Sequence, residues 1–158
     1  MQYDFEWDPA KASSNLRDHK VSFERASQVF LDPNMLSIED EEHSADEDRW
    51  ITLGIDKSGV LLVVCHTFRE VDPVNCNIRL ISARKPTRRG DDMKEEYDFS
   101  KGVRGKFYRP DARLNLPVYL DDDIAEFVQE YARRKKVDVQ TIVNEMLRRN
   151  KEMLQALQ

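Results

Sequence analysis

The end of the chain, residues 113–158, combines one strand pattern with two helix patterns, and no other feature constrains the fold as strongly. Residues 113–120 alternate apolar with other side chains, as a half-buried strand does. Two amphipathic stretches follow, the first opened by aspartates at 121–123 and the second starting near Val139. A lone strand has two unpaired edges, and about 45 residues rarely sustain a core without a metal, a disulfide or a partner. We therefore expect this segment to form an intertwined homodimer in which each strand pairs with its twin.

This segment resembles the ribbon-helix-helix family of DNA-binding proteins, in particular antitoxins of toxin–antitoxin pairs, over Leu114-Asn115-Leu116-Pro117-Val118-Tyr119-Leu120-Asp121-Asp122-Asp123-Ile124. The resemblance implies a two-stranded ribbon in the major groove of operator DNA, with Arg113, Asn115 and Tyr119 facing outward. Asn115 suits adenine, and Arg113 suits guanine or a phosphate. Pro117 stands where a polar residue is expected, so base reading depends on fewer side chains. The alternative is that Arg113 and Asn115 are ordinary solvent-exposed strand residues.

Charge is divided unevenly along the 158 residues, whose formal net charge is −5. Residues 1–98 carry 13 basic and 21 acidic side chains, a net charge of −8, whereas residues 99–158 carry 12 and 9, a net charge of +3. This asymmetry indicates a boundary near residue 98 and a C-terminal part that can approach a polyanion. Residues 99–110 contain two glycines and a proline without an apolar period, which predicts a tether. We expect a domain over 1–92, a linker and arm over 93–112, and a domain over 113–158.

The first part predicts an α+β fold with two N-terminal helices, a small antiparallel sheet and a following helix near residues 93–97. Asp8-Pro9 is a helix start, and Ser22 can cap a second helix that ends at Asp32-Pro33. The first helix should end near His19. Lys57-Ser58-Gly59 suits a tight hairpin turn. The strand-like runs are Met35–Glu39, Arg49–Asp56, Val60–Phe68 and Asn77–Arg84. The acidic stretch between the first two runs is interpreted as a solvated loop.

Residues 1–90 also resemble BrnT-type toxins, because many short matches recur in the order and spacing of that family. The matches are Tyr3 to Trp7, Asp8-Pro9-Ala10-Lys11, Asn15-Leu16-Arg17-Asp18-His19, Val21-Ser22-Phe23, Asp32-Pro33, Ile51-Thr52-Leu53-Gly54, His66-Thr67-Phe68-Arg69 and Ile81-Ser82-Ala83-Arg84-Lys85. The resemblance implies a RelE-like ribonuclease that needs no metal or other cofactor, and a BrnA-type antitoxin with a ribbon-helix-helix domain as its partner. The chain thus resembles a toxin and an antitoxin joined in one polypeptide.

His66, Arg69, Ser82 and Arg84 match the motif positions of this toxin family. RNA cleavage without metal requires a proton acceptor for the 2′-hydroxyl, cations for the charged phosphorane and an acid for the leaving oxygen. We assign Arg69 and Arg84 to phosphate binding and transition-state charge, His66 to proton transfer and Ser82 to positioning. The alternative for His66 is a hydrogen-bonded strand histidine without a proton role. The alternative for the arginines is ion pairing with the acidic loop.

Strand alternation places His66 on one face with Leu62 and Val64. The same alternation places Ser82 and Arg84 on one face with Ile78 and Leu80. These polar side chains should therefore border a cleft at a sheet edge. We expect Lys85, Arg88 and Arg89 to contact the RNA backbone.

Other site classes are poorly supported by the sequence. Cys65, Cys76, His43 and His66 lack the paired spacing of a structural zinc site. Cys65 and His66 should point to opposite faces of a strand, which excludes a Cys–His nucleophilic pair. The longest apolar run, Val60–Cys65, is too short to cross a bilayer, and the first residues do not form a secretory signal, so we expect no membrane association and a cytoplasmic location.

Three functional hypotheses follow. The leading one is a self-neutralised toxin, because a tether of about a dozen residues gives an effective concentration near millimolar; such a chain would act as a dimeric autorepressor on operator DNA. The second is a latent ribonuclease that proteolysis of the tether releases. The third is a non-enzymatic DNA-binding regulator with a degenerate toxin-like domain.

Overall fold

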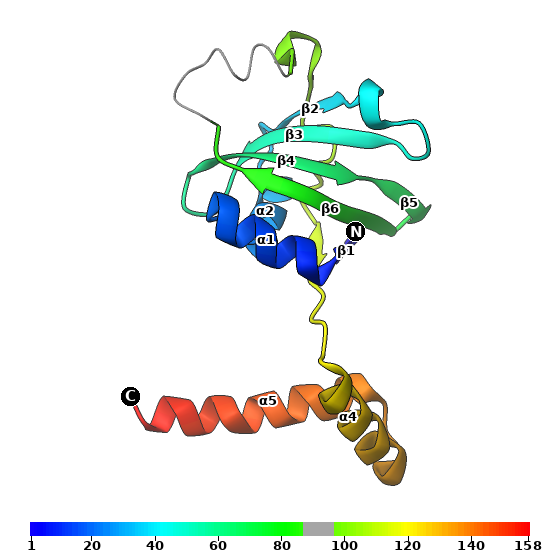
Figure 1. Cartoon of the computed structure of the whole chain (residues 1–158), viewed down its shortest axis with the longest axis vertical. Coiled ribbons are helices and arrows are strands. Elements are labelled where there is room, and N and C mark those ends of the chain that lie inside the picture. The colour runs from blue at the N-terminus through cyan, green and yellow to red at the C-terminus, as the bar shows by residue number, and fades with distance from the viewer. Residues whose placement is uncertain (87–96) are drawn as a thin grey trace. The chain divides into compact units, whose positions relative to one another are not determined.

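The computed structural model describes residues 1–86 and 97–158, and the chain divides into two compact units, Met1–Pro117 and Val118–Gln158 (Figure 1). The first unit contains β1 (Gln2–Glu6), α1 (Pro9–His19), α2 (Phe23–Ser27), η1 (Gln28–Leu31), β2 (Leu36–Glu39), η2 (Glu41–His43), β3 (Arg49–Ile55), β4 (Leu61–Thr67), β5 (Arg69–Asp72), β6 (Asn75–Arg84), η3 (Phe99–Lys101), β7 (Val103–Arg104) and β8 (Arg113–Asn115). The second contains α4 (Asp122–Lys135) and α5 (Val139–Ala156). The predicted α+β class is confirmed. The helix expected near residues 93–97 lies largely outside the described residues.

The two N-terminal helices begin where the sequence predicts. The Asp8 carboxylate accepts a hydrogen bond from the Ala10 amide at 2.8 Å, with Pro9 in the first helical position. Ser22 caps α2 by accepting from the Arg25 amide at 3.1 Å, but α2 ends at Ser27 and continues as the 3₁₀ turn η1. Both helices cover the same face of the sheet (Figure 1). The buried side chains of this core include Phe23, Ala26, Val29 and Phe30 from the helical segments and Tyr3, Phe5, Leu62, Val64, Ile78 and Leu80 from the strands.

The sheet is mixed rather than purely antiparallel. Its strand order is β7-β2-β3-β4-β6-β1-β8, with β5 paired to β6. The four predicted runs form β2, β3, β4 and β6, and their mutual pairings are antiparallel as expected. The unpredicted strand β1 runs parallel to both β6 and β8. Only Tyr3 and Phe5 of β1 point into the core, so this five-residue strand has a weak signal of its own.

A β-bulge interrupts the pairing of β4 with β6. Cys65 lies opposite Ser82, whereas the next residue, His66, lies opposite Leu80. The extra residue in β6 reverses which face the following side chains occupy. Leu80 and Ala83 are consequently both buried, and Ser82 between them faces the other side of the sheet.

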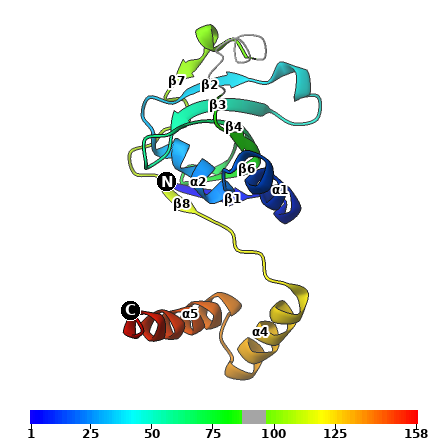
Figure 2. The same cartoon turned by 60° about the vertical axis from the view of Figure 1, so that its left-hand side comes forward.

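We name residues 97–115 the strap. They pack against the rest of the first unit instead of forming an open tether. β7 pairs with β2 at one edge of the sheet, and β8 pairs with β1 at the other (Figure 2). Between them the Phe107 ring is buried at 4% exposure, and its carbonyl accepts a hydrogen bond from the Tyr3 hydroxyl at 2.7 Å. Glycine in this segment was interpreted as a sign of flexibility. In the structure Gly105 forms a turn with a φ of 66°, a backbone angle that favours glycine. The assignment of residues 93–112 to an antitoxin arm stays a prediction.

The strand expected over residues 113–120 differs in extent and in partner. Only Arg113–Asn115 is a strand, and its partner within the chain is β1, in parallel, with Tyr3 opposite Leu114. Leu114 packs against the core, which explains why the apolar alternation is seen there. The sequence pattern indicates which side chains are buried but not which strand supplies the pairing edge. Pairing with a twin strand stays a prediction.

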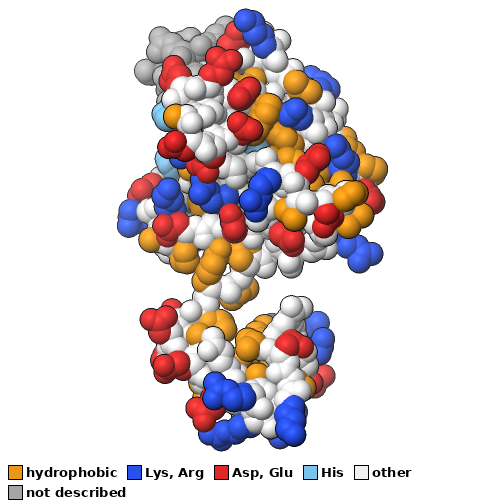
Figure 3. Space-filling model, turned by 90° about the vertical axis from the view of Figure 1, so that its right-hand side faces the viewer, with side chains coloured by type: hydrophobic (Ala, Val, Ile, Leu, Met, Phe, Trp, Pro, Cys, Tyr) orange, Lys and Arg blue, Asp and Glu red, His pale blue; other side chains and the backbone are white. Residues whose placement is uncertain are grey.

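The second unit is a pair of helices, both predicted from their amphipathic spacing. Its buried residues are Val128, Ala132 and Ile142. Apolar side chains also lie on its surface (Figure 3). Phe127 and Leu147 are each 60% exposed. Among the residues that the structure describes, no helix is long and apolar enough to cross a membrane.

Candidate functional site

One face of the sheet lies opposite the face that α1 and α2 cover, and we name it the open face. Strand pairing and alternation assign its side chains, because directly paired residues point to the same side. Its polar members include Gln2, Asp4 and Glu6 on β1, Arg49 on β3, Thr67 on β4, Arg69 on β5, Asn75, Asn77, Arg79, Ser82 and Arg84 on β6, and Arg113 and Asn115 on β8.

The bulge brings Ser82 and Arg84 to the open face and separates them from His66. The prediction that Ser82 and Arg84 share a face with Ile78 and Leu80 is therefore wrong, because strict alternation does not survive a bulge. Ser82 lies beside Cys65, and Arg84 lies opposite Val63. Burial raises the pKa of the Cys65 thiol, against a hydrogen bond with Ser82 that lowers it.

His66 lies in the core, where its exposure is 0%. Its Nδ1 donates to the Thr67 carbonyl at 3.1 Å, so its Nε2 accepts from the Thr52 hydroxyl at 2.7 Å, and Thr52 in turn accepts from Ser37 at 2.8 Å. Burial lowers the pKa of His66 to about 4, against the opposing hydrogen bond to Thr67. His66 therefore matches the alternative that the sequence left open, a hydrogen-bonded strand histidine.

Arg69 lies in a groove of about 360 Å³ on the open face. The groove also contains Thr67, Asn77 and Arg79, and acidic side chains border it: Glu6, Glu47 and Asp48. The Glu47 carboxylate accepts from Arg79 and, at 3.2 Å, from Arg49. Arg79 and Arg49 were not among the predicted site residues. The alternation of Asn77 and Arg79 with buried Ile78 and Leu80 is the sequence signal that could have identified Arg79.

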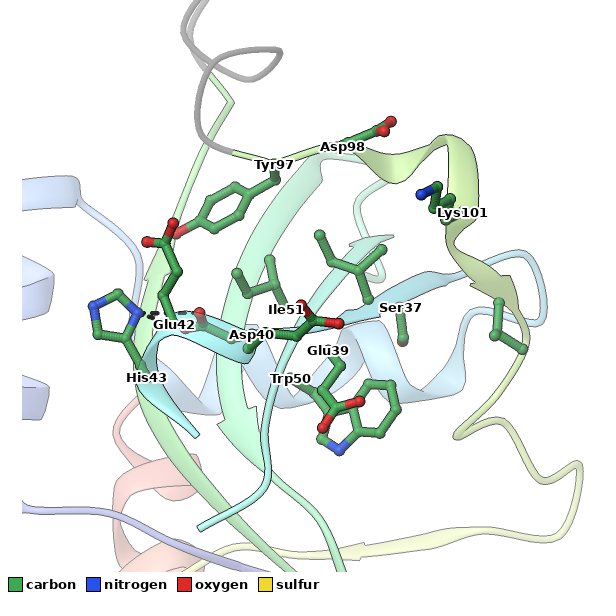
Figure 4. Close-up of a pocket in the computed structure, with 13 residues that line it drawn as sticks. Ser37, Glu39, Asp40, Glu42, His43, Trp50, Ile51, Tyr97, Asp98 and Lys101 are labelled. Carbon is green, nitrogen blue, oxygen red and sulfur yellow. Dashed lines mark hydrogen bonds and ion pairs between the residues drawn. The ribbon is translucent and has the colours of Figure 1, made fainter. Parts of the chain in front are cut away.

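A larger cavity of about 820 Å³ lies between the acidic loop and the beginning of the strap. In Figure 4 the carboxylates of Glu39, Asp40 and Glu42 come from β2 and the loop after it, whereas Tyr97, Asp98 and Lys101 come from the strap. Asp40 also accepts from the His43 imidazole at 3.0 Å. Five carboxylates line this cavity against one lysine, so it suits a polyanion less than the groove, where two arginines face three carboxylates.

The remaining predicted site residues are scattered. Lys85 is exposed just after β6, and Arg88 and Arg89 lie outside the described residues. The Asn115 amide was expected to contact adenine. In the structure it donates a hydrogen bond to the Asp4 carboxylate of β1 at 2.9 Å. Arg113 is exposed on β8, and Tyr119 is 47% exposed in the second unit.

The cysteines do not converge on a metal-binding cluster. Cys65 faces the open side of the sheet and His66 faces the core, as their adjacency predicted, and Cys76 is buried beside β1. Within residues 1–86 and 97–158, no three histidine, cysteine, aspartate or glutamate side chains lie close enough together to hold an ion.

Comparison with known proteins bears on the first unit. A protein-family model described as the ribonuclease toxin BrnT of type II toxin–antitoxin systems matches residues 7–90. Among solved structures, the ribonuclease toxin BrnT of Brucella abortus matches with 15% sequence identity and a TM-score of 0.39, over 54% of this chain and 99% of that chain. No curated protein matches the chain.

Proposed function

The chain belongs to the family of BrnT ribonuclease toxins of type II toxin–antitoxin systems, and from this premise we propose that its first unit binds and cleaves RNA on the open face of the sheet. Membership implies an RNA target and an antitoxin partner. The finer assignment is our own: a metal-independent endoribonuclease, held neutral by the strap and the second unit of the same chain.

A series of arginines along the open face carries this proposal. Arg69 and Arg79 line one groove, and Arg84 lies farther along the same face. Guanidinium groups bind phosphate oxygens through paired hydrogen bonds and stabilise the charge of a phosphorane transition state. We assign phosphate binding to Arg69 and Arg84 at two separate points along the RNA, and we assign Ser82 to positioning the RNA backbone beside Arg84. Lys85, and by sequence position Arg88 and Arg89, would extend the contact along the backbone.

We assign no catalytic role to His66 in the structure with the strap in place, where its ring contacts Phe107. The imidazole lies on the opposite face from Ser82, and its two nitrogens are engaged. None of the open-face side chains assigned above is an imidazole. The rate enhancement would thus come from positioning and charge stabilisation, with one water accepting the 2′-hydroxyl proton as its oxygen bonds to phosphorus and another water protonating the 5′-oxygen as its bond to phosphorus breaks.

A cleavage assay at high protein concentration measures the residual activity of the neutralised full chain. The full chain is used because Phe107 of the strap belongs to the core and a chain that ends at residue 92 lacks it. The substrate is a labelled RNA, and each reaction is repeated with a chelator. Arg84→Ala and Ser82→Ala should lower the cleavage rate by at least tenfold relative to Arg17→Ala, which removes an exposed helix arginine. Cleavage that the chelator abolishes, or that Arg84→Ala leaves unchanged, would refute the assignment.

A specific site for proteolysis, introduced between residues 90 and 93, tests neutralisation by the strap. The cut severs the covalent connection while the strap can stay bound. Cleavage of RNA that rises after the cut and after separation of the fragments supports neutralisation within the chain, provided that circular dichroism shows the N-terminal fragment to stay folded without Phe107. Equal cleavage before and after would show that the strap does not restrain the toxin-like unit.

We further propose that the second unit dimerises and, with residues 113–120, binds operator DNA. The exposure of Phe127 and Leu147 on a unit with few buried residues supports a missing partner, and a second copy of the chain is the partner we propose. If the open face proves inactive on RNA, this activity alone would describe a non-enzymatic regulator with a degenerate toxin-like unit, which is the alternative function.

A gel shift on the DNA upstream of the gene tests this second activity. Asn115→Ala and Arg113→Ala should weaken binding, since each removes a side chain that can contact bases or phosphates. Asp4→Ala is the matched control, because it removes the same Asn115 hydrogen bond without removing a proposed DNA contact. Equal affinity for all variants would refute the ribbon assignment.

A further inference from the structure

The carboxylate of Glu47 bridges two arginines of the open face. Arg79 and Arg49 both donate to the same oxygen, Oε1, the latter at 3.2 Å. All three side chains stay partly exposed, at 31% for Arg49, 33% for Glu47 and 40% for Arg79. The ion pair therefore borders solvent, at the margin of the groove that contains Arg69.

The strand register explains why the two arginines meet. Arg49 on β3 lies opposite Thr67 on β4, and the Thr67 hydroxyl accepts from the Arg79 amide at 3.4 Å. The three residues thus form one row across neighbouring strands, which rigid backbone pairing holds in place. Glu47, in contrast, comes from the loop between η2 and β3.

A carboxylate held by two guanidinium groups occupies the position that a phosphate oxygen would take. Both anions are recognised by planar N–H donors, and a phosphate diester offers oxygens to each arginine at once. Desolvation opposes ionisation of Glu47, but the two arginines outweigh this effect and lower its pKa, so the carboxylate stays ionised and competes as an anion.

We propose that Arg49 and Arg79 form a phosphate subsite for single-stranded RNA, and that Glu47 is an internal competitor that RNA must displace. The choice of RNA as the ligand rests on the function proposed above. Arg79 lines the same groove as Arg69, and Arg49 lies next to it through their shared contact with Glu47. Loss of the Glu47 interaction would free two cations for the backbone.

The contrasting explanation is that Glu47 only fastens the loop to the sheet. The two explanations predict different results for Glu47→Gln, which retains the shape of the side chain and removes its charge. As a competitor, Glu47 weakens RNA binding, and its neutralisation must strengthen binding. As a fastener, it has no effect on RNA beyond the change in net charge.

Binding is measured by fluorescence anisotropy with a labelled 2′-O-methyl oligoribonucleotide, which lacks the attacking hydroxyl and stays intact. Glu47→Gln should bind roughly tenfold more tightly than the unmodified chain, because charge-assisted hydrogen bonds become available to phosphate. Asp46→Asn is the matched control: it lies in the same loop and makes the same change in net charge. The salt dependence should also steepen by about 0.7 in log–log slope for each additional phosphate that the arginines neutralise.

Adding Arg79→Ala to Glu47→Gln should abolish the tighter binding, and Glu47→Ala should reproduce it if the glutamine variant folds poorly. Equal binding by Glu47→Gln and Asp46→Asn, or weaker binding by Glu47→Gln, would overturn the subsite. Cleavage of ordinary RNA is scored separately. Tighter binding with no cleavage, either before or after the cut between residues 90 and 93, retains the subsite and refutes the ribonuclease, whereas cleavage without tighter binding refutes the subsite alone.

Discussion

Replacement of Phe107 by alanine should destabilise the first unit strongly, because this ring lies within the aromatic core. It stacks on Phe68 with ring centroids 4.4 Å apart, and it meets Trp50 and His66 edge to face at 5.3 and 5.2 Å. Removing a buried phenylalanine costs about 3–5 kcal/mol of unfolding free energy. For a unit of this size, that corresponds to a fall in Tm of about 12–20 °C, at about 4 °C per kcal/mol.

Tryptophan fluorescence is the appropriate assay, since Trp7 and Trp50 are the two tryptophans of the chain and both belong to the first unit. Phe99→Ala makes the same chemical change within the strap, at a side chain that is not fully buried. It should cost less than about 1 kcal/mol. Equal losses of stability in the two variants would refute the conclusion that the strap is part of the core.

Three further predictions follow from the fold. Because burial holds the pKa of His66 at about 4, below its ordinary 6.5, the unfolded chain binds a proton that the folded chain excludes; stability should fall by about 2 kcal/mol between pH 7 and pH 5, and urea unfolding of His66→Asn should lose that component. Asn15→Ala should cost about 2–4 kcal/mol in thermal unfolding, since its buried amide makes three hydrogen bonds, two of them with Ala83 beside the bulge; an unchanged Tm would contradict this. Phe127→Asp should convert a dimer to monomer in light scattering, whereas Gln129→Asp on the same helix should not, and a monomeric unmodified chain would rule out the dimer.

Local signals were sufficient for much of the first unit. Asp8 and Ser22 each cap the predicted helix because a short polar side chain before an amphipathic stretch can satisfy only nearby amides. The turn at Gly59 is equally local, with a φ of 82°. The amphipathic stripes of α4 and α5 span several turns each, which makes their period easy to recognise.

The candidate site was harder to predict because its geometry depends on pairing between distant strands. The bulge between Cys65 and His66 is set by how β4 meets β6, and it decides the face of Ser82 and Arg84. Phe107 and its neighbour Tyr108 lie among glycines and cations, so no periodicity marks Phe107 as buried. Asn115 illustrates the same difficulty, since its partner Asp4 is 111 positions away.

The contact between Tyr3 and Phe107 joins a residue made at the start of synthesis to one made much later. The two residues are 104 positions apart, and the ribosome needs roughly 5–20 s to synthesise the chain between them. During this interval the arginines at positions 49–84 already exist, while the ring that closes the core does not. A translation product that stops before residue 107 therefore contains the arginines of the open face but lacks the last part of the hydrophobic core of the first unit.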